Sequence, residues 1–261
     1  MDKAGSEHIV TLLEIQGLCR NFGGLKAVCD LEAHIEKGKI TSLIGPNGAG
    51  KTTAFNLVTG LLPVSQGKIF FKGSDITGLP PYKIAALGIA RTFQNIRIFS
   101  NMTVHENVMI GLHARTRKGV FSAAFKLPGL KHEERYISEE AMKQLRFVGL
   151  DHAASLSAGN LAFGQQRILE IARALATRPD LLLLDEPAAG LNSQETIKIG
   201  ELIKDILNQG ITVFLVEHDM ELVMSISDTV FVLNNGALIT YGKPSDIQNN
   251  EEVIRAYLGE D

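Results

Sequence analysis

The stretch "GPNGAGKTT", from Gly45 to Thr53, has the residue types and spacing of a phosphate-binding loop. It fits the pattern G-x-x-x-x-G-K-[ST] and stands between an apolar run, "ITSLI", and a helix-forming stretch, "KTTAFNLVTG". Glycines let backbone N–H groups point inward around a phosphate, and the start of the following helix adds partial positive charge. Lys51 is expected to reach the β- and γ-phosphates of a nucleotide, and the Thr52 hydroxyl to bind Mg²⁺. The predicted phosphate-binding residues are Gly45, Pro46, Asn47, Gly48, Ala49, Gly50, Lys51, Thr52 and Thr53.

Two adjacent carboxylates, Asp185 and Glu186, follow the apolar run "LLLL". Such a run is typical of a strand buried on both faces of a parallel sheet, and an open α/β sheet binds ligands at the carboxyl ends of its strands. Asp185 is therefore expected to hold Mg²⁺ through water. Glu186 is expected to polarise the water that attacks the γ-phosphate, a role worth on the order of 10²–10⁴ in rate. For each carboxylate, the alternative is a purely structural residue at the end of a strand.

Three further residues are candidates for the same site. His218 follows another apolar run, "ITVFLVE", and is expected at the same sheet edge in contact with the γ-phosphate, while Asp219 is expected to cap the next helix. The alternative for His218 is a core or capping residue. Gln94, in "RTFQN", indicates nothing by its type alone. Phe22, in "RNFGG", is equally consistent with a core residue and with a platform for adenine.

A second turn, "LAFGQ", opens an amphipathic helix far along the chain; it consists of Leu161, Ala162, Phe163, Gly164 and Gln165. The helix is expected to start at Gly164 or Gln165 and to end before Pro179. Its spacing predicts one apolar face, with Arg167, Glu170 and Arg173 on the opposite polar face. The start of this helix is a second anion site. It is either redundant or meant for a nucleotide held by another copy, and an ordinary capped helix is the alternative.

The bulk composition is that of a globular protein and disfavours nucleic acid as a partner. The chain has 261 residues, 45% of them hydrophobic and 21% charged, with a net charge of −3. Cys19 and Cys29 show no CxxC spacing, so we expect reduced thiols in a reducing compartment. No apolar run reaches the roughly 18 residues of a spanning helix, and "MDKAGSEHIV" lacks the features of a signal peptide. Any work at a membrane would then require recruitment by other proteins.

The elements that position these residues follow from periodicity and turn residues. Strands are predicted over 9–16, 26–35, 38–45 and 67–73. From about Ile89 to Ala158 the spacing predicts helices, mainly over 103–115 and 133–150, and no strand. Residues 180–219 predict a βαβ unit whose helix, 193–210, ends at Gly210. Asn235-Gly236 predicts a hairpin turn within 229–242, followed by a short helix around 251–258.

Taken in order, Phe22, "GPNGAGKT", Gln94, "LAFGQ", "LLLLDE", "AAGLN" and His218 resemble the ATP-binding subunits of ABC transporters over nearly the whole chain. The resemblance implies an α/β fold: a P-loop NTPase with a RecA-like core, an antiparallel β subdomain and an inserted helical subdomain. One domain would span 1–261, with core and β subdomain at about 1–92 and 160–240, the helical subdomain at about 93–159, and a short helical tail at about 241–261.

The same resemblance implies the parts of the active site. ATP and Mg²⁺ would be the cofactors, with Thr52, Gln94 and Asp185 toward the metal. Glu186, His218 and Gln94 would form the catalytic set. The "LAFGQ" turn of one subunit would complete the ATP site of a second ATPase subunit, in a homodimer or a heterodimer.

Longer stretches look like the branched-chain amino-acid importer subfamily, whose relatives include urea and amide importers; they are "FGGLKAV", "RTFQNIRIFSNMTVHENV", "NLAFGQQRILEIARAL" and "IRAYLG". The likeness implies that ATP hydrolysis energises uptake through membrane permease subunits. Coupling helices of the permease would contact Gln94 and the segment Asn95–Val108, for whose apolar residues ordinary core packing is the alternative. A periplasmic binding protein would act indirectly, and the chain would sit on the cytoplasmic face of the inner membrane. One alternative is the same ATPase role in an importer of urea, amides or other amino acids. A less favoured alternative is a soluble ABC ATPase that does not act in transport.

Three positions depart from the broader ABC pattern. Ala162 stands where a serine is usual, Phe163 replaces a glycine, and Asn192 stands where many relatives have an aspartate. A hydroxyl contact from residue 162 to the partner's γ-phosphate is therefore unavailable. The backbone N–H groups around Gly164 and the helix dipole remain for this role.

Overall fold

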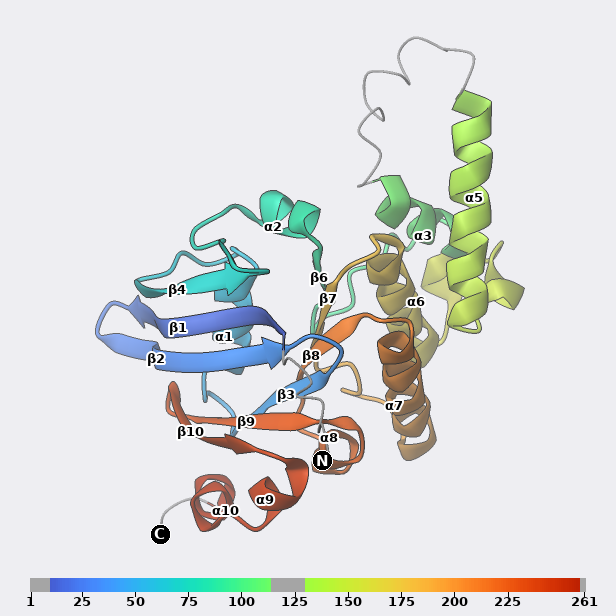
Figure 1. Cartoon of the computed structure of the whole chain (residues 1–261). Helices are drawn as coiled ribbons and strands as arrows, with labels where there is room; N and C mark the ends of the chain where they lie inside the picture. Colours follow the sequence, from blue (N-terminus) through green and yellow to red (C-terminus); the bar gives the residue numbers. More distant parts are fainter. Residues whose placement is uncertain (1–9, 114–129, 259–261) are drawn as a thin grey trace, which may run out of the picture.

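Two β-sheets and several layers of helices make up the part of the chain that the computed structural model describes, residues 10–113 and 130–258 (Figure 1). The first residue of the strand predicted over 9–16, the last two of the helix predicted over 103–115, and residues 259–261 of the predicted tail lie outside these ranges. The larger sheet has six strands in the order β10-β9-β3-β8-β7-β6, and the smaller has four in the order β2-β1-β4-β5. The α/β fold class predicted from the sequence is confirmed.

The six-stranded sheet is parallel apart from the β9–β10 hairpin. Its strands are β3 (Ile40–Ile44), β6 (Ile89–Arg91), β7 (Leu181–Asp185), β8 (Thr212–Val216), β9 (Thr229–Asn234) and β10 (Ala237–Gly242). Every residue of β3, β7 and β8 is buried, as apolar runs covered on both faces predict. The loops that follow these three strands carry the candidate site.

The prediction that no strand occurs between about Ile89 and Ala158 was wrong for one short element, β6 (Ile89–Arg91). Its three residues pair in parallel with β7, and Arg91 lies opposite Leu183. A strand of three residues is too short to show an alternating pattern, and its backbone pairing is supplied by a neighbour that lies about 90 positions away in sequence. The consequence matters for the site, because β6 brings Arg91 next to the end of β7.

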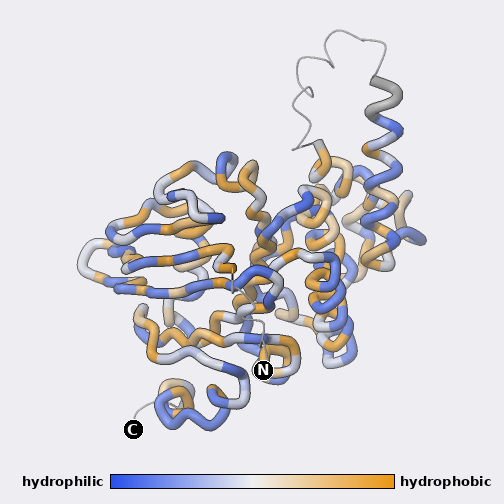
Figure 2. The backbone as a smooth tube through the Cα atoms, in the orientation of Figure 1, coloured by the Kyte–Doolittle hydropathy of each residue, from blue (hydrophilic) through white to orange (hydrophobic). Residues whose placement is uncertain are grey.

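The four-stranded sheet is antiparallel and packs over the phosphate-binding loop's helix. Its strands are β1 (Thr11–Phe22), β2 (Leu25–Glu36), β4 (Gln66–Phe71) and β5 (Ser74–Asp75). Helix α1 (Lys51–Val58) contributes Phe55 to a core shared with both sheets. The rings of Phe55 and Phe214 lie 4.9 Å apart, and burial of a side chain of this size stabilises by about 1.5–3 kcal/mol. Apolar segments therefore converge on this region (Figure 2).

Most of the remaining helices cover the other face of the six-stranded sheet or extend beyond it (Figure 1), whereas Ile84, on the helix at Pro81–Leu87, packs into the core shared with α1. The remaining helices are α2 (Pro81–Leu87), α3 (Val104–His113), α5 (Leu130–Phe147), α6 (Phe163–Ala176), α7 (Ser193–Asn208), α8 (Met220–Ile226), α9 (Pro244–Gln248) and α10 (Glu251–Leu258), with short turns of 3₁₀ helix at Asp151–Ala153 and Ala158–Asn160. Helix α6 belongs to two cores. One of its faces packs on the sheet, and another packs on α3 and α5.

Several helices and turns end where local signals in the sequence predict. Gly210 follows the end of α7 with φ +85°. Asn235 and Gly236 both have positive φ and turn the chain between β9 and β10. Asp219 caps α8 by accepting a hydrogen bond from the Leu222 N–H at 3.0 Å. Across 10–113 and 130–258, no helix combines the length and the apolar character needed to cross a membrane.

Candidate functional site

A cavity of about 530 Å³ opens over the loop between β3 and α1. It is lined by Phe22, Leu25, Lys26, Ala27, Asn47, Gly48, Ala49, Gly50, Lys51, Thr52, Thr53, Glu186 and Asn235. Of the predicted phosphate-binding residues, those from Asn47 to Thr53 reach the cavity, whereas Gly45 and Pro46 form the base of the loop beneath it.

The loop backbone requires glycine at two positions. Gly45 has φ +151°, and a Cβ there would lie 2.1 Å from the Leu233 carbonyl oxygen; Gly50 has φ +101°, and its Cβ would lie 2.4 Å from the Ala27 carbonyl oxygen. Gly50 is also the N-cap of α1, with no side chain capping the helix. The N–H groups of the first turn of α1 are thus available to an anion in the cavity.

The Lys51 ammonium group is held inside the loop. Its Nζ donates to the carbonyl oxygens of Gly45 at 2.7 Å and Pro46 at 3.1 Å. Burial lowers the pKa of Lys51, and the nearby negative charges of Glu186 and Asp185 act against this change. Lys51 lines the cavity together with Glu186, so its ammonium group is within the space where a phosphate would bind.

Phe22 lies at the edge of the cavity and outside the hydrophobic core. Its side chain is 43% exposed. The Arg20 guanidinium sits 4.6 Å from the centre of its ring. Of the two interpretations of Phe22 left open by the sequence, the core position is therefore wrong, and an exposed aromatic surface at the cavity's edge is what the structure contains.

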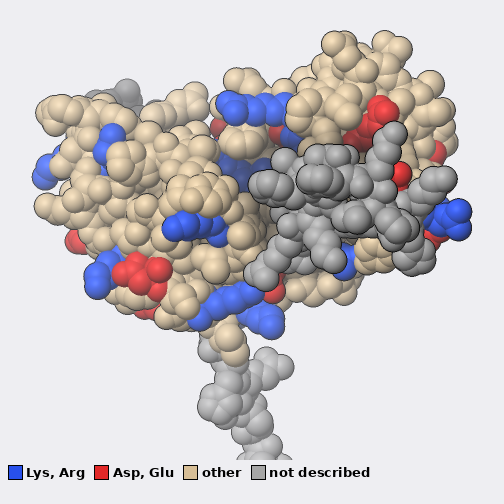
Figure 3. Space-filling model, turned by 90° about the horizontal axis from the view of Figure 1, so that it is seen from above, with Lys and Arg blue, Asp and Glu red and all other residues tan. Residues whose placement is uncertain are grey.

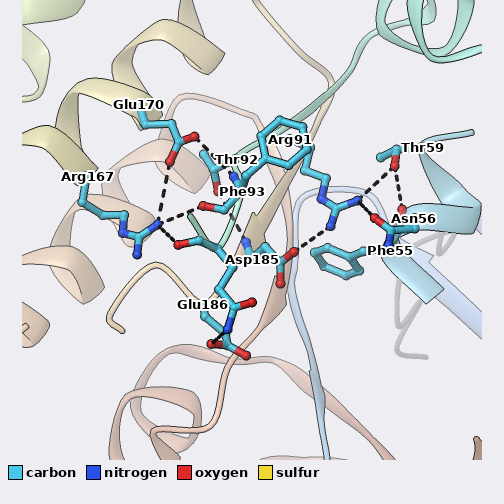
Figure 4. Close-up of polar contacts among 11 residues, drawn as sticks. Phe55, Asn56, Thr59, Arg91, Thr92, Phe93, Arg167, Glu170, Asp185 and Glu186 are labelled. Atoms are coloured by element: carbon cyan, nitrogen blue, oxygen red, sulfur yellow. Dashed lines mark hydrogen bonds and ion pairs between the residues drawn. The ribbon is translucent and has the colours of Figure 1, made fainter. Parts of the chain in front are cut away.

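Asp185 and Glu186 stand at the carboxyl end of β7 in different environments. Asp185 is buried, and its Oδ2 accepts a hydrogen bond from the Arg91 guanidinium at 2.6 Å (Figure 4). Burial raises the pKa of Asp185, while Arg91 opposes the rise. Glu186 lines the cavity and has φ +49°, an uncommon value for a residue with a Cβ. Strained backbone of this kind clusters at functional sites, where the surrounding structure holds it in place.

Gln94 and His218 converge on the carboxylate of Glu186. The Gln94 amide nitrogen donates to Glu186 Oε2 at 2.7 Å, and His218 Nδ1 lies 3.9 Å from the same oxygen. The His218 side chain is 58% exposed, so it is not a core residue. Its Nδ1 also lies 3.6 Å from Glu217, which is fully buried. Three side chains from three separate segments therefore meet beside the cavity.

The donor set fits a magnesium ion held together with phosphate. Among the described residues, Asp185 Oδ1 is buried without a hydrogen-bond partner, and the Thr52 hydroxyl lies at the open start of α1. Gln94 donates through its nitrogen, which leaves its amide oxygen as an acceptor. Within the same residues, no group of three or more His, Cys, Asp or Glu could hold a metal by itself. Mg²⁺ typically binds one or two carboxylates plus substrate phosphate oxygens, and this site offers those protein ligands.

The Leu161–Gln165 turn lies away from this cavity, since none of its five residues lines it. Helix α6 begins at Phe163, one residue earlier than predicted, and Ala162 is an N-cap without an acceptor side chain. The Ala162 N–H donates to Gln165 Oε1 at 3.2 Å, so half of a capping box is present. Phe163 is half exposed and its ring lies over Gly190, in the loop after Glu186. The chain thus presents a second, outward-facing helix start.

The predicted polar face of α6 was wrong at two positions. Arg167 and Glu170 are 2% and 1% exposed. Arg173 is also largely covered, with 19% of its side chain exposed. Arg167 and Glu170 bind the backbone of the irregular segment around Gln94 (Figure 4). A helical wheel marks charged residues as exposed, and it cannot show that another segment covers them.

Sequence reasoning also missed Arg91. Besides pairing with Asp185, its guanidinium donates to Asn56 Oδ1 at 2.7 Å and Thr59 Oγ1 at 3.1 Å on the helix α1 side (Figure 4). It lies over the rings of Phe55 and Phe93. The only signal in the sequence is a charged residue directly after the apolar pair Ile89-Ala90, which does not identify a partner 94 positions away.

A second cavity, of about 450 Å³, is mainly apolar and lies between α2, β6, α3 and α6. Its lining includes Phe93, Arg97, Phe99, Ile110, Glu170 and Arg173. Figure 3 shows the molecule from above relative to Figure 1. In this view, Lys and Arg side chains lie along the hollow that divides the surface. The segment from Gln94 to Phe99 therefore runs from Glu186, which lines the first cavity, to the second cavity, whose lining includes Arg97 and Phe99.

Comparisons with known proteins agree with this geometry. A family model described as ABC transporter matches residues 28–189, and one described as branched-chain amino acid ATP-binding cassette transporter matches residues 237–261. The chain is 48% identical over 250 residues to the high-affinity branched-chain amino acid transport ATP-binding protein BraF of Pseudomonas aeruginosa, which spans 95% of this chain and 98% of that relative. It is 46% identical, with the same coverage, to the corresponding protein LivG of Escherichia coli.

Solved structures give the same answer. A nucleotide-free ATP-binding cassette from an ABC transporter superposes with a TM-score of 0.84 at 33% identity, covering 96% of this chain and all of that one. An ABC transporter cassette in its ADP conformation has a TM-score of 0.84 at 32% identity, with the same coverage. The chain therefore belongs to the ATP-binding cassette family of ABC transporters, in its branched-chain amino acid branch.

Proposed function

We propose that this chain is the ATP-hydrolysing subunit of an ABC importer that energises uptake of branched-chain amino acids. The observation that carries the proposal is the convergence of Gln94 and His218 on Glu186 at the edge of the phosphate-binding cavity. A carboxylate placed beside a bound γ-phosphate and oriented by an amide and an imidazole is suited to activate water. The amino-acid class rests on the names of the 46–48% identical relatives.

The nucleotide would bind through the start of α1 and Lys51. The uncapped first turn of α1 and backbone N–H groups of the loop residues that line the cavity would supply hydrogen bonds to phosphate. Lys51 would exchange its two carbonyl partners for phosphate oxygens. Phe22 offers its exposed ring to adenine at the rim. These residues would bind and orient ATP, and holding the reacting groups in the right geometry lowers the entropic part of the activation barrier.

Thr52, Gln94 and Asp185 would hold Mg²⁺, which when bound neutralises charge on the phosphates. Glu186 accepts a proton from the attacking water. Gln94 donates a hydrogen bond to Glu186 Oε2 at 2.7 Å and so fixes that carboxylate's direction. His218, whose Nδ1 lies 3.9 Å from Glu186 Oε2, would contact the γ-phosphate.

The Leu161–Gln165 turn would serve the ATP site of a second ATPase subunit. Its residues do not line the cavity of their own chain, and the half-exposed Phe163 projects from the helix start. With no side chain capping it, the first turn of α6 keeps N–H groups for an anion.

The 450 Å³ cavity would receive a coupling helix of a membrane permease. It is lined by apolar side chains with Arg97, Glu170 and Arg173 among them, and it adjoins the segment that carries Gln94. Docking there would link permease movement to the Glu186 site. The chain would then lie at the cytoplasmic face of the inner membrane, bound to its permease, and a periplasmic binding protein would act on the other side.

An uptake assay tests this function. Cells that lack the chain's gene are complemented with the wild type or with Lys51→Met, and import of labelled leucine, isoleucine and valine is measured with urea as a competitor. Wild-type complementation should restore import that urea does not compete, and Lys51→Met should not. Competition by urea, or equal import with both forms, would contradict the assignment.

A further inference from the structure

Arg167 and Glu170, one turn apart on α6, bind the backbone of the segment Phe93–Arg97. Arg167 Nη1 donates to the carbonyl oxygens of Phe93 at 2.9 Å and Gln94 at 2.8 Å. Glu170 Oε1 accepts from the N–H group of Phe93 at 3.4 Å (Figure 4). The same oxygen accepts from the N–H group of Arg97 at 3.3 Å. A single helix face thus supplies donors and acceptors to a segment that has no regular secondary structure of its own.

Both side chains are buried, so these bonds matter more than surface contacts would. Arg167 Nη1 and Glu170 Oε2 lie 3.8 Å apart, and each side chain is 3% exposed or less. Burial lowers the pKa of Arg167 and raises that of Glu170, and the opposite charge of each partner acts against these changes. Hydrogen bonds from charged groups are about twice as strong as neutral ones. The pair is therefore able to hold an otherwise irregular backbone in one position.

The segment Phe93–Arg97 contains Gln94, and the Leu161–Gln165 turn lies at the start of α6. Gln94 reaches Glu186 from this segment, and α6 begins at Phe163. We propose that Arg167 and Glu170 are positioning residues that fix the segment Phe93–Arg97 to α6, so that the position of Gln94 at Glu186 follows the position of this helix. The inference rests on the proposed function for the meaning of that coupling, though the attachment itself does not depend on it.

An attachment of this kind differs from ordinary core packing in a measurable way. If the pair only fills space, its loss lowers global stability and leaves the amides of residues 93–97 protected until the fold opens. If the pair fixes the segment, its loss exposes those amides to solvent while the rest of the protein stays folded. Local amide exchange therefore separates the two roles.

Hydrogen–deuterium exchange on the full-length, nucleotide-free protein, read by mass spectrometry, makes the test. Arg167→Met removes the donor and keeps the aliphatic stem, and Glu170→Leu removes the acceptor. Each should speed exchange in peptides covering 92–99 by about tenfold or more, because each leaves buried backbone groups without partners. Arg167→Lys keeps a charged donor group and Glu170→Gln keeps an acceptor oxygen. Both should give smaller increases, and they serve as milder variants if Arg167→Met or Glu170→Leu fails to fold.

Arg178→Met is the matched control. It removes an arginine after the end of α6 that also makes two hydrogen bonds, at 2.8 Å to Tyr136 and 2.9 Å to Glu140, but none to the segment. Its exchange over 92–99 should equal that of the wild type. Unchanged exchange in Arg167→Met and Glu170→Leu, or an equal rise in Arg178→Met, would overturn the attachment.

Phosphate release separates this inference from the proposed function. Arg167→Met should bind ATP as the wild type does and release phosphate at least tenfold more slowly, because Arg167 does not line the phosphate-binding cavity. Faster exchange with unchanged release would uphold the attachment and overturn the role of Gln94. Unchanged exchange would overturn the attachment whatever the release rate.

Discussion

Replacing Arg91 with methionine is expected to destabilise the protein strongly, because it leaves a carboxylate unpaired in the interior. The side chains of Arg91 and Asp185 are 5% and 1% exposed, and their closest N and O atoms are 2.6 Å apart. Methionine keeps much of the stem that packs against Phe55 and Phe93, so the change mainly removes the charge and its donors. The other oxygen of Asp185 already has no partner among the described residues, which makes Arg91 the main group that offsets this charge.

The expected size of the effect follows from this geometry. Removing one member of a buried ion pair costs about 3–5 kcal/mol, because the remaining charge stays buried. The same guanidinium also holds Asn56 and Thr59, whose hydrogen bonds stabilise by about 1 kcal/mol each. Since one group makes all these contacts, the losses do not add in full, and we expect about 3–5 kcal/mol in total.

Urea unfolding followed by far-UV circular dichroism measures the change, since the chain has no tryptophan for a fluorescence assay. The double variant Arg91→Met with Asp185→Leu replaces the pair by apolar side chains and should recover most of the lost stability. Lys39→Met is the control. It breaks a pair at 3.4 Å with Asp228 whose side chains are 47% and 36% exposed, and should cost less than about 1 kcal/mol.

Two results would refute the reasoning about Arg91. One is an Arg91→Met variant that loses no more stability than Lys39→Met. The other is a double variant as unstable as the single one, which would mean that the buried charge of Asp185 is not the source of the loss.

Three further substitutions test other parts of the account. Gly45→Ala should cost about 1–3 kcal/mol or more and weaken ATP binding, because its Cβ would lie 2.1 Å from Leu233 O. Gly48→Ala has the backbone strain of φ +82° but no clash, since nothing lies within 4 Å of its Cβ, so it should cost less; equal losses in an unfolding assay would contradict this. Asn192→Ala should cost about 1 kcal/mol in the same assay, because the Asn192 side chain accepts from the Glu195 N–H at 3.0 Å, whereas Asn192→Asp keeps this cap and should be nearly neutral. Ala162→Ser should gain about 0.5–1 kcal/mol by completing the capping box with Gln165, with turnover unchanged; a large rise in turnover would show that the missing hydroxyl limits catalysis.

Features that depend on neighbouring residues in the sequence were predicted well. Each of these features has a signal within about a dozen residues of sequence. They are the glycine-rich loop before α1, the buried strands β3, β7 and β8, the helix end at Gly210 and the turn at Asn235-Gly236. Glu186 could be placed at a sheet edge because the end of a buried strand precedes it. Such signals predict the main elements and the sheet edge at which the candidate residues lie.

Features that depend on contacts between distant segments were missed. Arg91 pairs with a residue 94 positions away, and Arg167 binds carbonyl groups 73 and 74 positions away. Strand β6 exists because β7 offers it a backbone partner. The helical period of α6 correctly predicts a helix, yet it assigns Arg167 and Glu170 to solvent, because the segment that covers them has no signal in that period. Charged residues in the interior are therefore where the structure adds most to the sequence.

The role of Glu186 is tested most directly by phosphate release from the Glu186→Gln variant. The measurement uses saturating Mg·ATP, with the partner ATPase subunit supplied, and ATP affinity is determined in parallel. The amide keeps the shape of the side chain and cannot accept the proton from water, so ATP affinity should match the wild type while release falls by on the order of 10²–10⁴. Substantial residual release by Glu186→Gln, with ATP bound normally, would contradict the assignment of this carboxylate as the group that activates water.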